Sequence, residues 1–424
     1  MKKSLLVVGG IIGFFWLSSF SGLAHGKYVF NITPSISISE GYDDNIYLTP
    51  DHETSDYITA VSPSINMGLF GKYTNLSLTY GLSFVRYDDE DQNDTTRHLA
   101  TLLFSQKLGR HLSIELSDTF IRSEDPFEET EGIIGIRQTR NEYWRNTGRA
   151  ALNYQFGRED SFTLSYEQSN LENDDQDVDD GRIMNPSGTL TLWMTQKSGL
   201  ELTYGYIKAD FWRERGKAGD DYTGNSGIIR YMHRFTRHAM GYVGYEYNDR
   251  DFDGTTEDYK VHEGFMGWEQ SLSPTFDLSL RVGYFIQDNE TSEDENGFSY
   301  IANLTKRLRR GTISLGGEGG WNEAYLEAER RGFTRYWSAR ARVDYQVLKP
   351  LGLYVGGSYR QDKHPTDRRW KTSTANTGFR VTFWRWFSVE MEYEYLDRND
   401  DIDAYDYTAN RVMLIFRASK LFRL

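Results

Sequence analysis

The chain has 424 residues, a formal net charge of −14 and no cysteine; only 38% of its residues are hydrophobic, and its mean hydropathy is −0.64. This composition is too polar for a helical membrane protein, leaves no residue for a disulfide or a thiolate metal site, and makes a nucleic-acid partner a poor fit. Aromatic residues reach 15% and include 29 tyrosines, which is typical of a membrane β-barrel with rings at both lipid interfaces.

The N-terminus has the three parts of a secretory signal. Lys2 and Lys3 precede an apolar run from Leu5 to Phe20, and small residues follow up to Ala24. The run is shorter than the ~20 residues of a spanning helix. We therefore expect a signal peptide over residues 1–24 and a mature chain over residues 25–424.

Alternation of apolar and polar residues is the dominant pattern of the mature chain. In residues 75–87, Leu76, Leu78, Tyr80, Leu82 and Phe84 alternate with small or polar residues, and the same pattern recurs near residues 200, 280 and 390. A period of two indicates strands with one apolar face. Such segments, about 10 residues or more long and without helical stretches between them, predict an all-β transmembrane barrel with an apolar outside and a wet lumen.

Short breaks divide these strands at a nearly regular spacing. They fall near Thr74, Gly109, Glu159, Lys197, Arg237, Pro274, Arg310, Pro350 and Arg385. Ten longer polar segments lie between them, so nine turns and ten loops predict an antiparallel up-and-down barrel of about 20 strands, with 18 as the alternative. Strand-like sequence starts at Val29–Ser39, so we expect no plug domain.

The longer loops are acidic, as in Asp88–Asp91 and Glu293–Glu295, whereas most short turns carry Lys or Arg. The loop acids are either solvated tips or sites where divalent cations bridge to phosphates of the outer leaflet, or where the acidic field steers a ligand. Barrels of this kind have short periplasmic turns and longer outer loops. Both chain ends are therefore expected on the periplasmic side of the outer membrane of a Gram-negative bacterium.

Charged residues on the polar parity form a candidate lumen wall. The candidates are Glu115, Glu201, Arg281, Arg340, Arg342, Arg380, Glu390, Glu392 and Glu394, with Asp344 and Arg411 beside them. Each charge either belongs to a cross-strand ion pair that satisfies the wall or selects solutes.

The loop Glu124–Arg137 is the candidate constriction, because it combines five carboxylates with an apolar patch. Its candidate residues are Glu124, Asp125, Glu128, Glu129, Glu131, Ile133 and Ile134. If this loop folds into the lumen, its acids face wall arginines across the pore. The alternatives are packing over the barrel rim and pairing with a neighbouring loop.

The first mature segment, Ile32–Tyr47, contains Glu40-Gly41-Tyr42-Asp43-Asp44-Asn45-Ile46. This motif resembles the opening hairpin of the outer-membrane β-barrel porins encoded with exopolysaccharide synthesis and export genes, and Val61–Ile65 fits the returning strand. The resemblance implies an outer-membrane channel, with a polysaccharide exit pore as one role, and carries no catalytic residues to this chain. The same residues also fit a structural role in ordering the rim.

Scattered histidines form no H-E-x-x-H or Ser/His/acid pattern, so we expect neither an enzyme nor a cofactor. The sequence predicts a conduit for a secreted polysaccharide, with a general diffusion porin as the alternative and a structural or enzymatic barrel as the alternative of another class. Expected partners are outer-membrane lipid and lipopolysaccharide, the polysaccharide and periplasmic export proteins.

Overall fold

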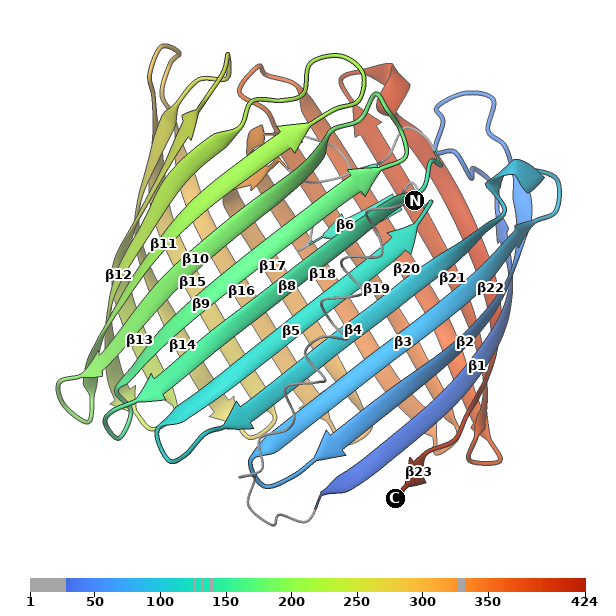
Figure 1. Cartoon of the computed structure of the whole chain (residues 1–424), viewed down its shortest axis with the longest axis horizontal. Helices are drawn as coiled ribbons and strands as arrows, with labels where there is room; N and C mark the ends of the chain where they lie inside the picture. The colour runs from blue at the N-terminus through green and yellow to red at the C-terminus, as the bar shows by residue number, and fades with distance from the viewer. Residues whose placement is uncertain (1–27, 126, 131–132, 137–139, 326–331) are drawn as a thin grey trace.

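Alternating polarity gives each strand one face for lipid and one for the interior, so the sheet can satisfy its backbone only by closing on itself. The computed structural model describes residues 28–125, 127–130, 133–136, 140–325 and 332–424 (Figure 1). The predicted signal peptide, residues 1–24, lies outside these ranges. In the described part, the helical segments are two short 3₁₀ turns, Asp91–Asn93 and Asp403–Tyr405, and no helix there could cross a bilayer.

Twenty antiparallel strands form the barrel. They are β1 (Val29–Asp43), β2 (Asp56–Phe70), β3 (Thr74–Tyr87), β4 (Thr95–Lys107), β5 (Leu112–Ser123), β8 (Tyr143–Gln155), β9 (Ser161–Asn173), β10 (Asp180–Trp193), β11 (Ser198–Trp212), β12 (Tyr222–Thr236), β13 (Ala239–Phe252), β14 (Tyr259–Ser273), β15 (Phe276–Asn289), β16 (Glu295–Leu308), β17 (Gly311–Ala324), β18 (Gly332–Leu348), β19 (Leu351–Lys363), β20 (Arg369–Phe383), β21 (Phe387–Asp400) and β22 (Tyr407–Ser419). A separate hairpin is formed by β6 (Phe127–Thr130) and β7 (Ile133–Ile136). The prediction of about 20 strands is confirmed.

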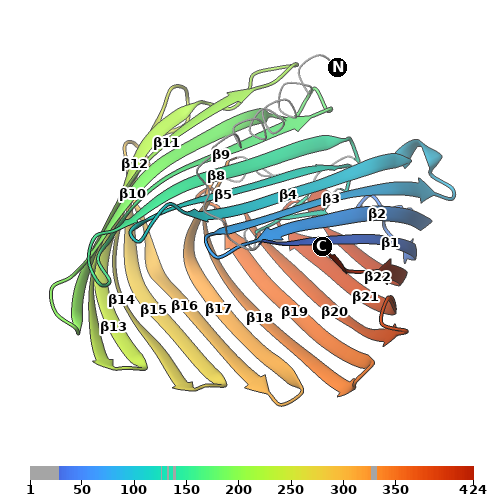
Figure 2. The same cartoon turned by 60° about the horizontal axis from the view of Figure 1, so that its bottom comes forward.

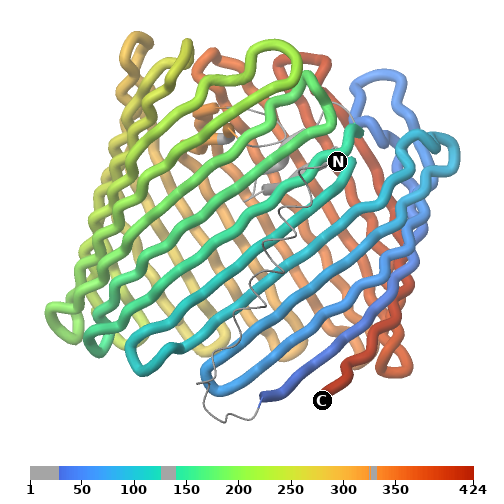
Figure 3. The backbone as a smooth tube through the Cα atoms, viewed as in Figure 1, coloured from blue at the N-terminus to red at the C-terminus, as the bar shows by residue number. Residues whose placement is uncertain are grey.

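The barrel closes where the first strand meets the last. β1 pairs with β2 on one side and with β22 on the other, from Ser35 opposite Ser419 to Asp43 opposite Arg411. The two-residue β23 (Phe422–Arg423) continues this seam beside β1. Pro34 has no N–H to donate and stands where the ladder shifts from β22 to β23. Figures 2 and 3 show the tilted strands following one another around the wall.

The apolar parity faces outward, as predicted. Tyr204, Val282 and Val355 on this parity are 54–60% exposed in the isolated chain. Exposed rings and aliphatic side chains at alternate positions are what a lipid-facing band requires. Directly paired residues share a face, so the register places the predicted wall charges on the other side of the sheet.

Turn lengths divide the two ends of the barrel as predicted. The nine turns at one end run from two residues at 237–238 to five at 156–160, whereas the ten loops at the other end reach nineteen residues at 124–142. β1 begins and β22 ends at the short-turn end (Figure 1). All described strands except β6 and β7 belong to the barrel sheet, and the absence of a plug domain stays a prediction.

Aspartates close many of the outer loops, which accounts for part of their acidity. In six loops a carboxylate near the loop's end accepts a hydrogen bond, 2.6–3.2 Å long, from a backbone N–H of the last or the last but one residue of the preceding strand. The pairs are Asp94 with Tyr87, Asp180 with Asn173, Asp221 with Phe211, Asp258 with Phe252, Asp294 with Asn289 and Asp406 with Asp400. These side chains act like the Asx groups that stabilise ordinary turns. These six aspartates thus have a structural role in their loops, in addition to solvation at the loop tips or the binding and steering of charged partners.

Other loop acids join neighbouring loops. Asp220 accepts from the backbone N–H groups of Thr255 and Thr256 at 2.6 Å each, and Glu257 accepts from those of Thr291 and Ser292. Hydrogen bonds from Thr256 hold the pKa of the Asp220 carboxyl well below its usual range, and those from Ser292 and Thr291 lower the pKa of Glu257 to about 2. The loops of β11 to β16 are therefore linked in series by ionised carboxylates.

Candidate channel and its inner wall

Most of the predicted wall charges lie in ion pairs. Arg281 binds Glu246 at 3.0 Å and Glu263 at 2.7 Å, each on a neighbouring strand or the next but one. Among the other predicted residues, the pairs are Glu201 with Arg230, Arg340 with Glu318, Arg342 with Asp344, and Arg380 with Glu390. Glu394 lies opposite Arg411 in the register, and Glu115 lines a shallow hollow with Arg149. This arrangement fits the interpretation of a wall that satisfies its own charges.

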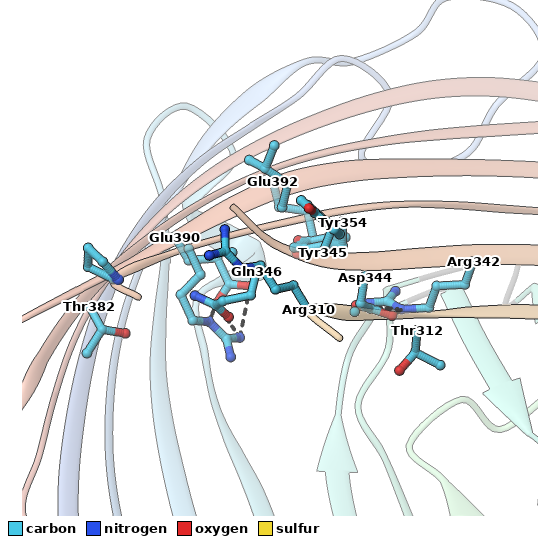
Figure 4. A pocket seen from close by; sticks show the side chains of 15 residues that line it. Arg310, Thr312, Arg342, Asp344, Tyr345, Gln346, Tyr354, Thr382, Glu390 and Glu392 are labelled. Carbon is cyan, nitrogen blue, oxygen red and sulfur yellow. Dashed lines mark hydrogen bonds and ion pairs between the residues drawn. The ribbon is translucent and has the colours of Figure 1, made fainter. Parts of the chain in front are cut away.

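Five of the predicted wall residues, Arg342, Asp344, Arg380, Glu390 and Glu392, line a recess of about 440 Å³ near the short-turn end. Figure 4 shows Arg342, Asp344, Tyr354 and Glu392 around it, together with Glu390, the partner of Arg380. Arg310, Thr312 and Thr382, close to the turns, complete its polar lining. The recess therefore offers guanidinium, carboxylate and hydroxyl groups beside an aromatic ring at the short-turn end of the barrel.

Rings face the lumen as well, each with a guanidinium above it. Arg281 lies 3.9 Å from the ring centre of Phe265 and Arg360 lies 4.0 Å from that of Tyr336, while Arg342 and Arg230 lie 4.9 and 5.2 Å from the rings of Tyr354 and Tyr242. Tyr242 and Tyr354 are each the fourth residue of a strand that starts at the short-turn end, whereas Tyr336 lies near the outer end of β18. Flat polar and aromatic surfaces thus occur along the height of the wall.

The start of the predicted constriction loop is anchored by two inward-facing acidic residues. Glu124 is almost fully buried, accepts hydrogen bonds from Arg97 Nε at 2.9 and 3.2 Å, and accepts one from the Tyr87 hydroxyl at 3.1 Å. Asp125 lies 3.7 Å from Arg97 and 4.0 Å from Arg411 on β22. The start of the loop therefore runs along the inside of the wall, with two of its acids facing arginines.

The rest of the predicted loop is described only in part. β6 and β7 pair from Phe127 opposite Ile136 to Thr130 opposite Ile133, which gives the backbone at Glu128, Glu129, Ile133 and Ile134. Their side chains, and Glu131 as a whole, lie outside the described structure. Whether this loop narrows the pore stays a prediction.

The opening motif fastens the barrel seam. Asp43 binds Arg411 on β22 at 2.7 Å, and Asp44 accepts from the backbone N–H and the side-chain amide of Asn410 at 2.6 and 2.7 Å. Asn45, fully buried, donates to the carbonyls of Thr408 and Thr49. The motif orders the rim where β1 meets β22, as the structural interpretation of these residues anticipated.

A set of inward-facing apolar residues lies near the outer loops and was not predicted from the sequence. Tyr222, Phe252, Tyr259, Val261 and Phe285 lie on the parity expected to be polar, yet each is less than 9% exposed. Trp321, Glu323, Tyr325 and Phe333, at the outer ends of β17 and β18, pack on this set or bond to it. In the sequence, these residues could have been recognised as large apolar side chains at polar-parity positions close to the strand ends.

Comparisons with solved structures show the same fold. The siderophore receptor PirA from Acinetobacter baumannii superposes with a TM-score of 0.52 at 8% identity, covering 92% of this chain and 80% of that one. The ferric enterobactin receptor PfeA from Pseudomonas aeruginosa gives a TM-score of 0.53 at 9% identity with the same coverage. The ferric citrate transporter FecA gives 0.54 at 10% identity, covering 93% of this chain and 78% of that one. At these identities the likeness establishes the barrel architecture alone.

No curated protein matches the chain at a significant level. A family profile described as "Putative beta-barrel porin 2" matches residues 20–189, a stretch that includes the opening motif and strands β1 to β9. The predicted resemblance to β-barrel porins is thereby confirmed: over residues 20–189 this chain matches that porin family.

Proposed function

We propose that the protein is an outer-membrane channel that carries a secreted polysaccharide outward. This proposal rests mainly on three lumen-facing rings that are partly exposed, Tyr242, Tyr336 and Tyr354, each with an arginine beside it. Sugar rings stack on aromatic faces, and their hydroxyls bond to guanidinium and carboxylate groups. The porin family match supports a channel rather than an enzyme, and a place in the outer membrane of a Gram-negative bacterium.

The recess at the periplasmic mouth is the natural first contact for a chain leaving the periplasm. Tyr354 offers one ring, and Glu392, Arg310 and Thr312 offer polar groups within the same hollow. A periplasmic export protein would deliver the chain here, and lipid and lipopolysaccharide would surround the apolar outer face. Since the wall charges are largely paired, we expect an uncharged or weakly charged sugar chain as the cargo.

A general diffusion porin is the second candidate, favoured by the contacts of the inward loop. Asp125 lies near Arg97 and Arg411, so opposite charges approach each other on the lumen side of β4 and β22. Such an arrangement orients small polar solutes in a transverse field. This function needs no stacking of sugars on the wall.

Single-channel conductance in planar bilayers separates the two candidates. We expect stable conductance that neutral oligosaccharides interrupt, and shorter interruptions in the Tyr242→Ala and Tyr354→Ala variants. The matched control is Phe298→Ala, because Phe298 lies on the outward parity and is 78% exposed. Conductance that no sugar modulates would favour the diffusion porin, and its absence in folded, heat-modifiable protein would contradict both candidates.

A further inference from the structure

The outer end of β17 leaves the barrel wall. β16 and β17 pair from Leu308 opposite Gly311 only as far as Tyr300 opposite Gly319, whereas β17 and β18 stay paired up to Ala324 opposite Gly332. Gly320, the next residue, has φ +148, and a Cβ there would lie 3.0 Å from the Ser299 Cβ. Glycine therefore permits both the turn of the backbone and its close approach to β16. Residues 321–325 and 332–335, here called the inner ribbon, continue as a two-stranded extension.

The inner ribbon crosses the inside of the wall to strands that are distant along the ring. Glu323 accepts a hydrogen bond from Arg250 on β13 at 2.6 Å and another from the Tyr259 hydroxyl on β14, also at 2.6 Å. The Tyr325 ring centre lies 5.0 Å from that of Tyr222 on β12, and the Tyr325 and Tyr259 hydroxyls are 2.9 Å apart. Trp321 donates to Glu263 on β14 at 3.1 Å. Charged, polar and aromatic contacts thus all hold the ribbon against β12 to β14.

The ribbon covers apolar residues that would otherwise face the wet lumen. Phe333 packs on Tyr259 and Phe285, with ring centres 5.7 and 6.4 Å apart, and on Trp321 in a stacked arrangement. Val261 and Phe285, on the inward parity, are 0% and 1% exposed. Large apolar side chains on the lumen side of a barrel this wide stay dry only beneath a cover. The burial and the contacts therefore place the ribbon inside the mouth.

The predicted constriction loop is anchored on the other side of the barrel. Its contacts fall on β3, β4 and β22, through Tyr87, Arg97 and Arg411. In the ring of twenty strands, β13 stands ten places from β1. The two inward elements therefore approach the outer mouth from opposite walls.

We propose that the inner ribbon is a second constriction element, held by Glu323, which sets the free opening of the outer mouth from the β12–β14 side. The proposal rests on the channel function proposed above. It assigns to Glu323 the role of a positioning residue: the carboxylate contacts no cargo, but joins the ribbon to Arg250 and Tyr259. The cargo then passes between this ribbon and the opposite wall.

A single engineered thiol can report on the ribbon, because the natural chain has no cysteine. Val261→Cys is a nearly isosteric change at a covered position, so labelling of the purified barrel by a charged maleimide measures how often the ribbon lifts. Glu323→Ala in this background is expected to label at least about tenfold faster. Tenfold corresponds to about 1.4 kcal/mol, near the lower end of what a hydrogen bond to a charged group contributes.

Two further variants complete the design. Glu323→Gln keeps the size of the side chain and one acceptor, so its labelling rate is expected between those of the parent and Glu323→Ala. Asp251→Ala removes a carboxylate next to Arg250 on the outward parity of β13, and its labelling rate is expected to equal that of the parent. Heat modifiability on gels confirms that each variant is folded.

Conductance of the same Glu323→Ala and Asp251→Ala proteins gives the second readout. Faster labelling with a higher single-channel conductance for Glu323→Ala alone is the expected result. An unchanged labelling rate would overturn the role of Glu323, and faster labelling at unchanged conductance would overturn the constriction. If no variant conducts while Glu323→Ala still labels faster, the role of Glu323 in holding the ribbon is supported and the proposed channel function is contradicted.

Discussion

Arg140 donates a hydrogen bond to the backbone carbonyl of Ile46 at 2.6 Å, and thereby joins the returning end of the inward loop to the opening motif of the chain. The same guanidinium donates to the Tyr87 hydroxyl at 2.6 Å, and that hydroxyl donates to Glu124 at the loop's start. Both ends of the loop 124–142 are thus held through one tyrosine on β3. The position of the loop depends on residues almost a hundred positions earlier in the chain.

Replacement of Arg140 should loosen this loop. Arg140→Ala leaves the buried Ile46 carbonyl without its guanidinium donor, at a cost of about 1–3 kcal/mol. We expect a lower temperature for the folded-to-unfolded shift on gels, and larger, noisier channel currents. Arg86→Ala is the control, because Arg86 is 75% exposed and its pair with Asp94 contributes about 0–1 kcal/mol. Identical behaviour of the two variants would contradict the anchoring role.

The seam between β1 and β22 should be sensitive to Asp43. Asp43→Asn leaves Arg411 without its 2.7 Å partner, and breaking a buried pair costs about 3–5 kcal/mol, reduced here because Asp125 lies 4.0 Å away. The unfolding temperature of the barrel in detergent should fall. The double variant Asp43→Asn/Arg411→Met removes both charges and should recover part of the loss. A double variant less stable than Asp43→Asn would argue against the pair as the cause.

Glu257 should stay ionised far into acid. Hydrogen bonds from Ser292 and Thr291 lower its pKa to about 2, below the ordinary value of ~4.3 for glutamate. Because the folded pKa is depressed, its stabilisation of the loops is present above the unfolded pKa and is lost as the pH falls toward 2. The effect on global stability is small, because the group is largely exposed to solvent. A ¹³C NMR titration of the Glu257 carboxyl in micelles measures it directly, and Ser292→Ala should raise the pKa; a wild-type pKa above 4 would contradict the contact.

The recess near the short-turn end should influence which ions pass. Arg342→Gln and Arg380→Gln each remove one positive charge from its lining. A unit charge about 10 Å from the ion path contributes about 0.4 kcal/mol in water, so each change should alter the local ion concentration about twofold in favour of cations. The reversal potential in a potassium chloride gradient reports this shift. Arg86→Gln, outside the recess, should leave the potential unchanged, and equal shifts in all three variants would disprove a local effect.

The strand pattern and the turns could be predicted from the sequence because both are local. Residues such as Pro274, Arg310 and Pro350 mark tight turns wherever they follow an apolar alternation, so the strand count emerged from the chain alone. Six outer loops are stabilised by another local interaction, in which an aspartate near the end of the loop accepts a hydrogen bond from a nearby backbone N–H. Interactions that span only a few residues can therefore be recognised from the sequence.

Interactions between distant strands could not be predicted in the same way. The rule that the lumen face is polar assumed water along the whole wall, and it fails where the inner ribbon covers Val261 and Phe285. Likewise, nothing in Glu323 itself identifies Arg250 as its partner 73 residues away. The wall candidates were located by parity, but their partners depend on register, which only the closed sheet determines.

The carboxylate that closes each of those six loops has a consequence for how such a barrel assembles. Every such bond spans at most ten residues, so a hairpin can complete its own tip as soon as its two strands have emerged. Growth can then proceed as the addition of finished hairpins to a sheet edge, each step requiring little loop-closure entropy. One event differs: Asp43, Asp44 and Asn45 must meet residues more than 360 positions away on β22. The contacts of residues 43–45 can therefore form only after β22 has been added to the sheet.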